Sequence, residues 1–498
     1  MKNVGKTLVL LDTDRIHDFV FATNKLKEIR GASAILNELN LERTYELMKG
    51  RGEKIFLGGG SGKLIFGDIS HAHDFCRDLE EMYKSSTAGE ASITTAIVPY
   101  DDSTEAMFME SLYRGEKELR KNKDFKYQPF QLLSDHYFKV CESSGIFPAE
   151  IIETGDNKLI SAACSKKREI ADEGKNSFFE EFVMFVKKSE NTSLGERIER
   201  NNWHTILSND LKKLLPGEIN SLASISDGYI GLIYADGNRM GQRLQNISNI
   251  EEYTTFSDRI LVSTKSAIFE ALAINLNMSD QFPFEILLLG GDDLLVIVPA
   301  DKAIAVAIDF CDNFRVKSKE VSMSAGVVIA HANYPIHQMI DYGKQLLKSA
   351  KKKGSKNQNN VENYIDFMVI KNSVHDTVPD IRENNLEYES EDGYRLRLFQ
   401  RPYTTDSLGS LIKKISRLKN EGKFPRSRLK QMYKSLFRGK NQAMLDYCLL
   451  LSRLDKDTSR KVMMDDFFAW CDLFPWLKRD DGLETPFLDL IELYDYIN

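Results

Sequence analysis

The sequence predicts an α+β protein in which one unit of strand, helix, hairpin, helix, strand and helix occurs twice. Two observations support this prediction. An acidic hairpin lies between apolar runs in the middle of the chain, and the N-terminal part repeats the pattern found around that hairpin. The expected domains are a degenerate copy of the unit over 1–135, a connector with helices over 136–220, an active copy over 221–375, and a helical C-terminal domain over 376–498.

The acidic hairpin occupies residues 284–298, where two runs typical of buried strands enclose Gly290-Gly291-Asp292-Asp293. The glycines permit the tight turn that joins the two strands. Two adjacent aspartates among apolar residues are costly to bury unless something neutralises them, and a divalent cation is a common partner. Taken alone, the tetrapeptide is equally compatible with a plain polar turn.

Another carboxylate, Asp236, ends the apolar run 229–236 and precedes Gly237 and Asn238. A strand-terminal aspartate followed by a hairpin-tip pair is the arrangement with which palm-type polymerases and cyclases hold two divalent cations against a nucleoside triphosphate. Oxygen donors with room for phosphate suit Mg²⁺ or Mn²⁺. The sequence therefore predicts that Asp236, Asp292 and Asp293 are metal ligands and catalytic residues.

A strand over 321–330 and an amphipathic helix over 339–350 follow the hairpin, which completes the element order of a ferredoxin-like palm. Lys351, at the end of that helix, would lie near the triphosphate as a point charge, although lysines are also common at solvated helix C-termini. Asn238 and Ser324 are equally compatible with turn or strand-face roles. The candidate nucleotide-binding residues are Gly237, Asn238, Gly290, Gly291, Ser324 and Lys351.

The N-terminal part echoes this unit. Residues 10–15 align with 234–239, and residues 55–66 mirror the acidic hairpin. Gly60 and Ser61 stand where the later copy has its two hairpin aspartates. The first copy is therefore expected to pair with the active palm while being poorly equipped to hold metals. Its glycine-rich run does not have P-loop spacing, and a strand rather than a helix is predicted to follow it.

These motifs resemble the large subunit of type III CRISPR effector complexes, a family with paired palm domains. Residues 14–33 carry the likeness to the first palm, residues 234–241 to the second, and Gly290–Asp293 to the cyclase motif. The resemblance implies a nucleotidyltransferase that converts ATP into cyclic oligoadenylate messengers within an RNA-guided antiviral complex. It also implies other effector subunits, guide RNA and target RNA as partners.

Two divalent cations would support this chemistry. One would lower the pKa of a ribose 3'-hydroxyl and the other would stabilise the pyrophosphate leaving group, so that a 3'-5' phosphodiester forms. Two alternatives remain open, a stand-alone signalling nucleotide cyclase and a non-enzymatic scaffold subunit. The intact acids argue against the scaffold, because a retired site is expected to resemble the first copy.

Two departures from the family pattern are expected. The first palm begins close to Met1, which predicts the form that lacks an N-terminal nuclease domain. The family often has a four-cysteine zinc site, whereas the corresponding pattern here contains Cys141, Ser144, Ser161 and Cys164. Because a neutral hydroxyl is a poor zinc ligand, we expect a zinc-ribbon remnant without structural zinc.

Composition sets the outer limits. The chain has 498 residues and is 42% hydrophobic and 28% charged, as in globular proteins of several domains. It has no apolar run long enough to span a membrane and no cleavable signal, and its six cysteines lack close spacing. A cytoplasmic protein without membrane contact is therefore expected. A net charge of -7 does not indicate a free-standing nucleic-acid binder.

The C-terminal part contains a basic segment, residues 411–440, with eleven Lys or Arg and a single acid. Apolar spacing over 408–418 predicts an amphipathic helix. RNA contact and a solvated helix surface are equally compatible with this charge. Of the two C-terminal tryptophans, Trp470 is predicted to be buried and Trp476 to lie on the surface.

Overall fold

The chain forms two compact units in the computed structural model. Unit 1 comprises Met1–Ser221, Gly237–Val296 and Pro335–His337, and unit 2 comprises Leu222–Asp236, Ile297–Tyr334 and Gln338–Asn498. The structure describes residues 6–497 except 102, 127–138, 154–156, 174–176, 208, 248, 320, 356–361, 373–375, 391–392, 421–423 and 454–474. The predicted boundary between 135 and 136 lies outside the described residues, and the predicted domain limits stay predictions.

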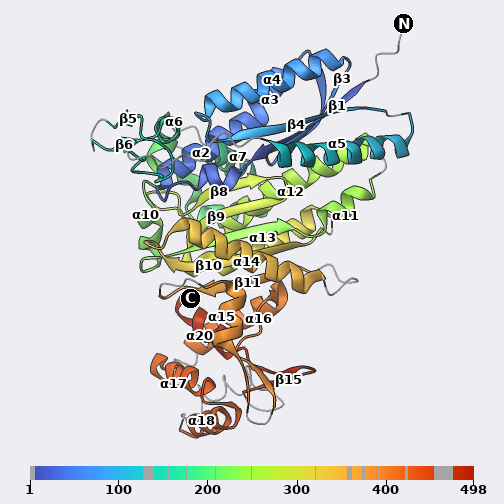
Figure 1. Cartoon of the computed structure of the whole chain (residues 1–498). Helices are drawn as coiled ribbons and strands as arrows, with labels where there is room; N and C mark the ends of the chain where they lie inside the picture. Colours follow the sequence, from blue (N-terminus) through green and yellow to red (C-terminus); the bar gives the residue numbers. More distant parts are fainter. Residues whose placement is uncertain are drawn as a thin grey trace. The chain divides into compact units, whose positions relative to one another are not determined.

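The elements from β1 to α5, which we call the first repeat, contain an antiparallel sheet of order β2-β3-β1-β4. With helices after β1 and after β3, this is the ferredoxin-like order. Central strand β1 is apolar throughout Leu8–Leu11 and buried there, and Figure 1 shows α4 and α5 on opposite sides of β4. The bounds are β1 Thr7–Asp14, α1 Ile16–Val20, α2 Leu26–Glu38, α3 Thr44–Met48, β2 Gly52–Gly58, β3 Ser61–Phe66, α4 Ile69–Ser86, β4 Ser92–Pro99 and α5 Glu105–Phe125.

The elements from β7 to α14, which we call the second repeat, contribute to a six-stranded sheet of order β14-β11-β10-β7-β9-β8. Its strands β10-β7-β9-β8 repeat the order β4-β1-β3-β2 of the first repeat. The strands read as nearly continuous apolar runs, as expected where both faces of a sheet are covered. The bounds are β7 Tyr229–Gly237, α11 Met240–Gln245, α12 Ile250–Asn275, β8 Glu285–Gly290, β9 Asp293–Pro299, α13 Ala300–Lys317, β10 Met323–His331, α14 Ile336–Ser355, β11 Tyr364–Val369 and β14 Tyr403–Thr404.

The connector of unit 1 is helical, as predicted, and packs through aromatic side chains. Phe182 of α7 contacts Trp203 at 5.0 Å between ring centroids and Phe284 at 5.1 Å. The indole nitrogen of Trp203 donates a hydrogen bond to the carbonyl oxygen of Ala273, so this buried ring has its polar atom satisfied. The bounds are β5 Ile151–Ile152, β6 Leu159–Ile160, α6 Ala162–Glu173, α7 Ser177–Ser189, α8 Gly195–Arg200, α9 Leu211–Leu214 and α10 Ile219–Ala223.

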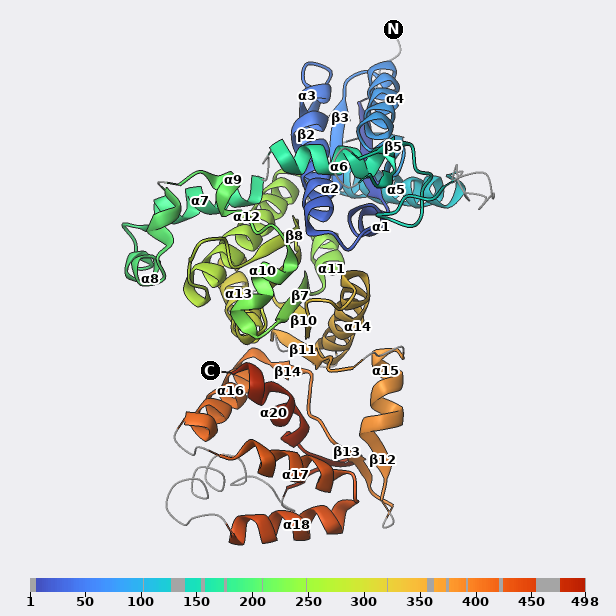
Figure 2. The same ribbon diagram turned by 90° about the vertical axis from the view of Figure 1, so that its left-hand side faces the viewer.

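The C-terminal part of unit 2 contains helices, as predicted, and in addition a sheet of order β12-β13-β16-β15 that was not predicted. These strands have three residues each and are partly charged, so they carry no periodic signal in the sequence. Figure 2 shows α17 and α18 side by side. The bounds are α15 Val378–Ile381, β12 Glu387–Glu389, β13 Arg395–Arg397, α16 Thr405–Asn420, α17 Arg426–Leu436, α18 Lys440–Ser452, β15 Leu477–Arg479, β16 Gly482–Glu484 and α20 Phe487–Leu493.

The amphipathic helix predicted over 408–418 is confirmed as the middle of α16, whose apolar face is buried through Leu408, Leu411, Ile415 and Leu418. The prediction for Trp476 is wrong, because its side chain is completely buried. Trp470 lies outside the described residues. Within the described part of the chain, no helix combines the length and the apolar character needed to cross a membrane.

Candidate functional site

The predicted strand-end acid, Asp236, is the penultimate residue of β7. The five residues before it are apolar or glycine and buried, so the strand delivers the carboxylate from the interior of unit 2 to a half-exposed position. Lys351 of α14 forms an ion pair with Asp236. The predicted point charge near the site therefore contacts a carboxylate in this structure, and its role as a phosphate ligand stays a prediction.

The acidic hairpin of unit 1 has the predicted form, with β8 ending at Gly290 and β9 beginning at Asp293. Gly291 has a φ of 62°, a conformation that favours glycine. Its carbonyl oxygen accepts a hydrogen bond of 2.8 Å from the hydroxyl of Thr264, which fixes the turn against α12. Both hairpin aspartates are partly exposed.

Gly237 lies directly against the acidic hairpin. A Cβ atom at this position would lie 2.7 Å from Oδ2 and 3.0 Å from Cβ of Asp292. The structure thus brings together two of the predicted site residues within unit 1, and it leaves no space between them for a side chain at position 237. Any residue other than glycine would displace the Asp292 carboxylate.

Two other residues were predicted as nucleotide contacts. Asn238 follows β7 and is partly exposed, whereas Ser324, the second residue of β10, is completely buried. Their roles as nucleotide contacts stay predictions. Among the residues that the structure describes, no group of three or more His, Cys, Asp or Glu side chains is arranged to hold a metal ion.

The donor chemistry nevertheless fits Mg²⁺ or Mn²⁺, because Asp236, Asp292 and Asp293 offer only carboxylate oxygens. The ammonium of Lys351 already supplies positive charge at Asp236. A cation that binds Asp236 would either share this carboxylate with Lys351 or displace it.

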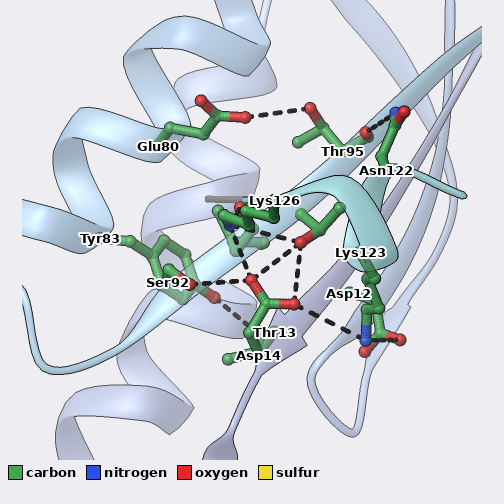
Figure 3. Close-up of polar contacts among 12 residues, drawn as sticks. Asp12, Thr13, Asp14, Glu80, Tyr83, Ser92, Thr95, Asn122, Lys123 and Lys126 are labelled. Carbon is green, nitrogen blue, oxygen red and sulfur yellow. Dashed lines mark hydrogen bonds and ion pairs between the residues drawn. The ribbon is translucent and has the colours of Figure 1, made fainter. Parts of the chain in front are cut away.

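The first repeat contains a polar cluster that the sequence analysis did not predict (Figure 3). Asp14 accepts hydrogen bonds of 2.8 Å from the hydroxyls of Ser92 and Thr94, and the ammonium of Lys126 lies 2.7 Å from the same carboxylate. The ammonium of Lys123 lies 2.6 Å from Asp12. The strand-end acids of this repeat are thus neutralised by two lysines from the end of α5.

The two repeats agree in detail at this position. The aligned carboxylates Asp12 and Asp236 each pair with a lysine from the helix after the last strand of the repeat, Lys123 and Lys351. The residue before the next helix is left-handed in both repeats, with φ of 55° at Arg15 and 57° at Arg239. The predicted repeat is therefore visible in backbone and side chains alike.

Within unit 1, the two hairpin tips touch through main-chain atoms. A Cβ atom on Gly290 would lie 2.6 Å from the Cα atom of Gly59, and one on Gly59 would lie 3.1 Å from the carbonyl carbon of Gly290. As predicted, a strand follows the glycine-rich run of the first repeat; its Lys63 donates a 2.7 Å hydrogen bond to the hydroxyl of Tyr253. The acid-free tip therefore packs directly against the acidic one.

The predicted zinc-ribbon remnant brings its four residues together. The sulfur atoms of Cys141 and Cys164 are 3.7 Å apart. The main-chain N–H of Ser144 donates to the Cys141 sulfur, and that of Cys164 donates to the hydroxyl of Ser161. Burial opposes ionisation of Cys141, but hydrogen bonds from Ser144 and its neighbours outweigh it and lower the pKa of this thiol to about 7.

Comparison with known protein families finds one family that matches the part of the chain containing this site. Residues 229–360 match the family described as Cas10/Cmr2, second palm domain. This part of the chain is similar to a Cas10/Cmr2 second palm domain. The matched palm contains all three predicted metal ligands and Lys351, and the sequence-based recognition of the family is confirmed there. A search of curated protein sequences found no match.

Solved structures of the family's Csm1 proteins share the fold of the chain. Csm1 of T. onnurineus matches with a TM-score of 0.60 and 12% identity, over 99% of this chain and 70% of that one. The Csm1–Csm4 cassette with AMPPNP matches with a TM-score of 0.59 and 15% identity, over 100% and 70%. The same cassette with cA4 matches with a TM-score of 0.58 and 14% identity, over 99% and 70%.

The chain spans about 70% of the length of these three relatives. It spans 54% of the length of the matched chain in the Csm1–Csm4 cassette with pppApA. At such identities the likeness establishes the fold, and the predicted α+β class with a Cas10 palm is confirmed.

Proposed function

We propose that this chain is the large subunit of a type III CRISPR effector complex and that its second palm converts ATP into cyclic oligoadenylates. The observation that carries the proposal is the match of residues 229–360 to the Cas10/Cmr2 second palm, which includes Asp236, Asp292, Asp293 and Lys351. Structures with the same fold have been determined with AMPPNP, cA3 and cA4, which supports ATP as substrate and cyclic oligoadenylate as product.

In this proposal Asp236, Asp292 and Asp293 hold two divalent cations. When bound, the cations lower the pKa of a ribose 3'-hydroxyl and neutralise charge on the triphosphate. The first repeat is then the degenerate palm, because it has glycine and serine at the hairpin tip and its remaining strand-end acids already bind lysines.

Each bond-forming step transfers a nucleotidyl group. The 3'-oxygen forms a bond to the α-phosphorus of the next nucleotide, the bond from that phosphorus to the β-phosphate oxygen breaks, and pyrophosphate leaves. The hydroxyl proton passes to solvent. Ring closure repeats the step within one linear oligonucleotide, with its own 5'-triphosphate as the electrophile.

The protein's part in this step is mainly to position charge. Lys351 can neutralise phosphate oxygens once a cation has taken its place at Asp236. Gly237 keeps the space beside Asp292 open, and the left-handed Gly291 holds the turn that presents the two aspartates. Asn238, Gly290 and Ser324 complete the proposed nucleotide site.

We further propose that guide RNA, target RNA and other effector subunits are partners of the chain. Matched structures are named as Csm1–Csm4 cassettes, which supports assembly with a second subunit. RNA contact by the basic segment 411–440 is part of this proposal.

The test is incubation with ATP and Mg²⁺ or Mn²⁺, for the chain alone and with partner subunits, guide RNA and target RNA, with products identified by mass spectrometry. Cyclic oligoadenylates that require target RNA and are absent from the Asp292→Ala, Asp293→Ala variant would support the proposal. Product from the chain alone would indicate a stand-alone cyclase. If no condition yields a product that depends on the two aspartates, the result would favour a non-enzymatic scaffold subunit.

A further inference from the structure

The C-terminal part of unit 2 contains a cavity of about 360 Å³. It lies between the end of α14, the first turns of α16, and the hairpin formed by β15 and β16. Its volume is at the lower end of the range of small-molecule sites. None of the residues discussed above as metal ligands or nucleotide contacts of the second palm lines it.

Positive charge dominates the lining. Lys353, Lys414 and Arg479 face one acid, Glu484. Glu484 is already engaged, because its carboxylate accepts hydrogen bonds from Arg479 at 2.6 Å and from the side-chain amide of Gln400 at 2.9 Å. Basic side chains therefore outnumber acidic ones among the residues that line the cavity.

The position of Lys353 supports the same reading. Its ammonium donates a long hydrogen bond of 3.3 Å to the carbonyl oxygen of Gln400. Desolvation by the surrounding protein lowers the pKa of this lysine, and the charges of Glu484, Asp366 and Asp489 only partly offset the effect. An anion beside Lys353 would relieve this cost.

The remaining walls suit a compact phosphorylated ligand. Ser407 and Ser410 of α16 add hydroxyl groups, which can donate to phosphate oxygens. Pro402, Pro486 and the ring of Tyr364 form apolar surface. The Tyr364 hydroxyl donates to Glu362 at 2.8 Å, so the ring is held in a fixed orientation.

We propose that this cavity binds a phosphate monoester, either as a free nucleoside monophosphate or as the 5' end of an RNA. Lysine and arginine side chains would bind the phosphate oxygens, and the proline and tyrosine wall would contact the attached nucleoside. The site is separate from the second palm and does not depend on the function proposed for it.

Helix α14 connects the cavity to the second palm, because it carries both Lys351 and Lys353. Lys353 is two residues after Lys351 on α14, so the two side chains leave the helix on different faces. One contacts Asp236 and the other lines the cavity. A ligand held by Lys353 would therefore restrain the last turns of the helix that carries Lys351.

The test is isothermal titration calorimetry on the full chain with EDTA present, which removes the divalent cations that the second palm requires. The probes are AMP and one RNA tetranucleotide prepared with either a 5'-phosphate or a 5'-hydroxyl. We expect saturable one-to-one binding of a phosphorylated probe, weakened about tenfold or more by Lys414→Ala and by Arg479→Ala. Lys413→Ala, which removes the same charge from an exposed neighbouring position on α16, should change the affinity by less than about twofold.

The outcomes separate the two sources of phosphate. AMP that binds as tightly as the phosphorylated RNA would indicate a free nucleotide, and RNA that binds about tenfold more tightly would indicate an RNA end. The proposal is overturned if no phosphorylated probe binds at millimolar concentration, if the 5'-hydroxyl RNA binds equally well, or if binding survives both cavity variants. Thermal melting of each variant checks that it is folded, and failure of ATP turnover would leave this test unaffected.

Discussion

The first and second repeats share strand order, a left-handed arginine and an aspartate–lysine pair, but they differ at the hairpin tip. The first repeat has Gly60 and Ser61 where the second has Asp292 and Asp293. In the first repeat, Asp14 also accepts hydrogen bonds from two hydroxyl groups and forms an ion pair with Lys126. In both repeats a lysine therefore pairs with the aspartate at the end of the central strand, whether or not the hairpin tip carries acids.

Under the proposed function, the difference also indicates which feature would separate a catalytic palm from a structural one. Both repeats carry a strand-end carboxylate paired with a lysine, so this pair alone does not predict metal binding. The second repeat has two carboxylates at its hairpin tip that the first repeat lacks. We therefore place the functional distinction in the hairpin tip.

The largest expected effect separates the aligned acids Asp236 and Asp12. Asp236→Asn should lower the rate of oligoadenylate formation by about a thousandfold, because a cation ligand is lost while the shape is kept. Asp12→Asn should change it by less than about threefold, because its carboxylate pairs with Lys123 in the repeat whose hairpin tip has no acids. Equal losses in a product assay on the assembled complex would refute the assignment of the first repeat as degenerate.

Glycine at the hairpin tips provides a second contrast. Gly290→Ala should destabilise the protein by about 1–3 kcal/mol, because the added methyl group meets the main chain of Gly59, which cannot rotate away. Gly67→Ala is the matched control, since a Cβ there has open space and no positive φ is required. Urea denaturation measures both, and a Gly290→Ala variant as stable as wild type would contradict the contact.

A third prediction concerns the ion pair between Lys126 and Asp14 in the first repeat. Lys126→Met should cost about 1–3 kcal/mol, because it leaves the largely buried Asp14 carboxylate without this charge partner. Adding Asp14→Asn should recover part of the loss. A double-mutant cycle by thermal or urea denaturation measures the coupling, and strictly additive losses would show that the pair contributes no interaction energy.

The smallest effect is a pH dependence at Glu28 of α2. Burial opposes its ionisation, but the hydrogen bond from Ser143 and the charge of Arg168 prevail and lower the pKa of this carboxyl. A group with a lowered pKa in the folded state stabilises at pH above its unfolded value and loses this contribution as the pH falls. Glu28→Gln should therefore cost about 1 kcal/mol at pH 7 and progressively less below pH 4. A stability difference that stays constant between pH 7 and pH 3 would contradict this origin.

The sequence predicted most of both repeats because their signals are local. The apolar runs around Gly290–Asp293 and the strand-end Asp236 are visible without knowledge of the fold, and the structure has the expected hairpin and strand end. The α14 helix was likewise predicted from apolar spacing. The identity of the metal ligands remains a prediction.

The features that were missed depend on contacts between distant residues. Lys123 and Lys126 meet Asp12 and Asp14 across more than a hundred positions, so no short window contains both partners. The sheet of the C-terminal part pairs β13 with β16 in parallel, again from distant segments. The burial of Trp476 was missed for a similar reason, since four charged residues follow at 478–481 and the contacts that cover its side chain belong to the tertiary structure.

The contact between Gly59 and Gly290 has a consequence for how such a protein can diverge. Where two main chains meet without side chains between them, the spacing is set by atomic radii, and no substitution can adjust it gradually. The residues next to this contact differ between the repeats, with Gly60 in the first and Asp292 in the second. Gly59 and Gly290 cannot be replaced in the same way, so a duplicated domain can lose its catalytic residues while the contact between its hairpin tips is kept.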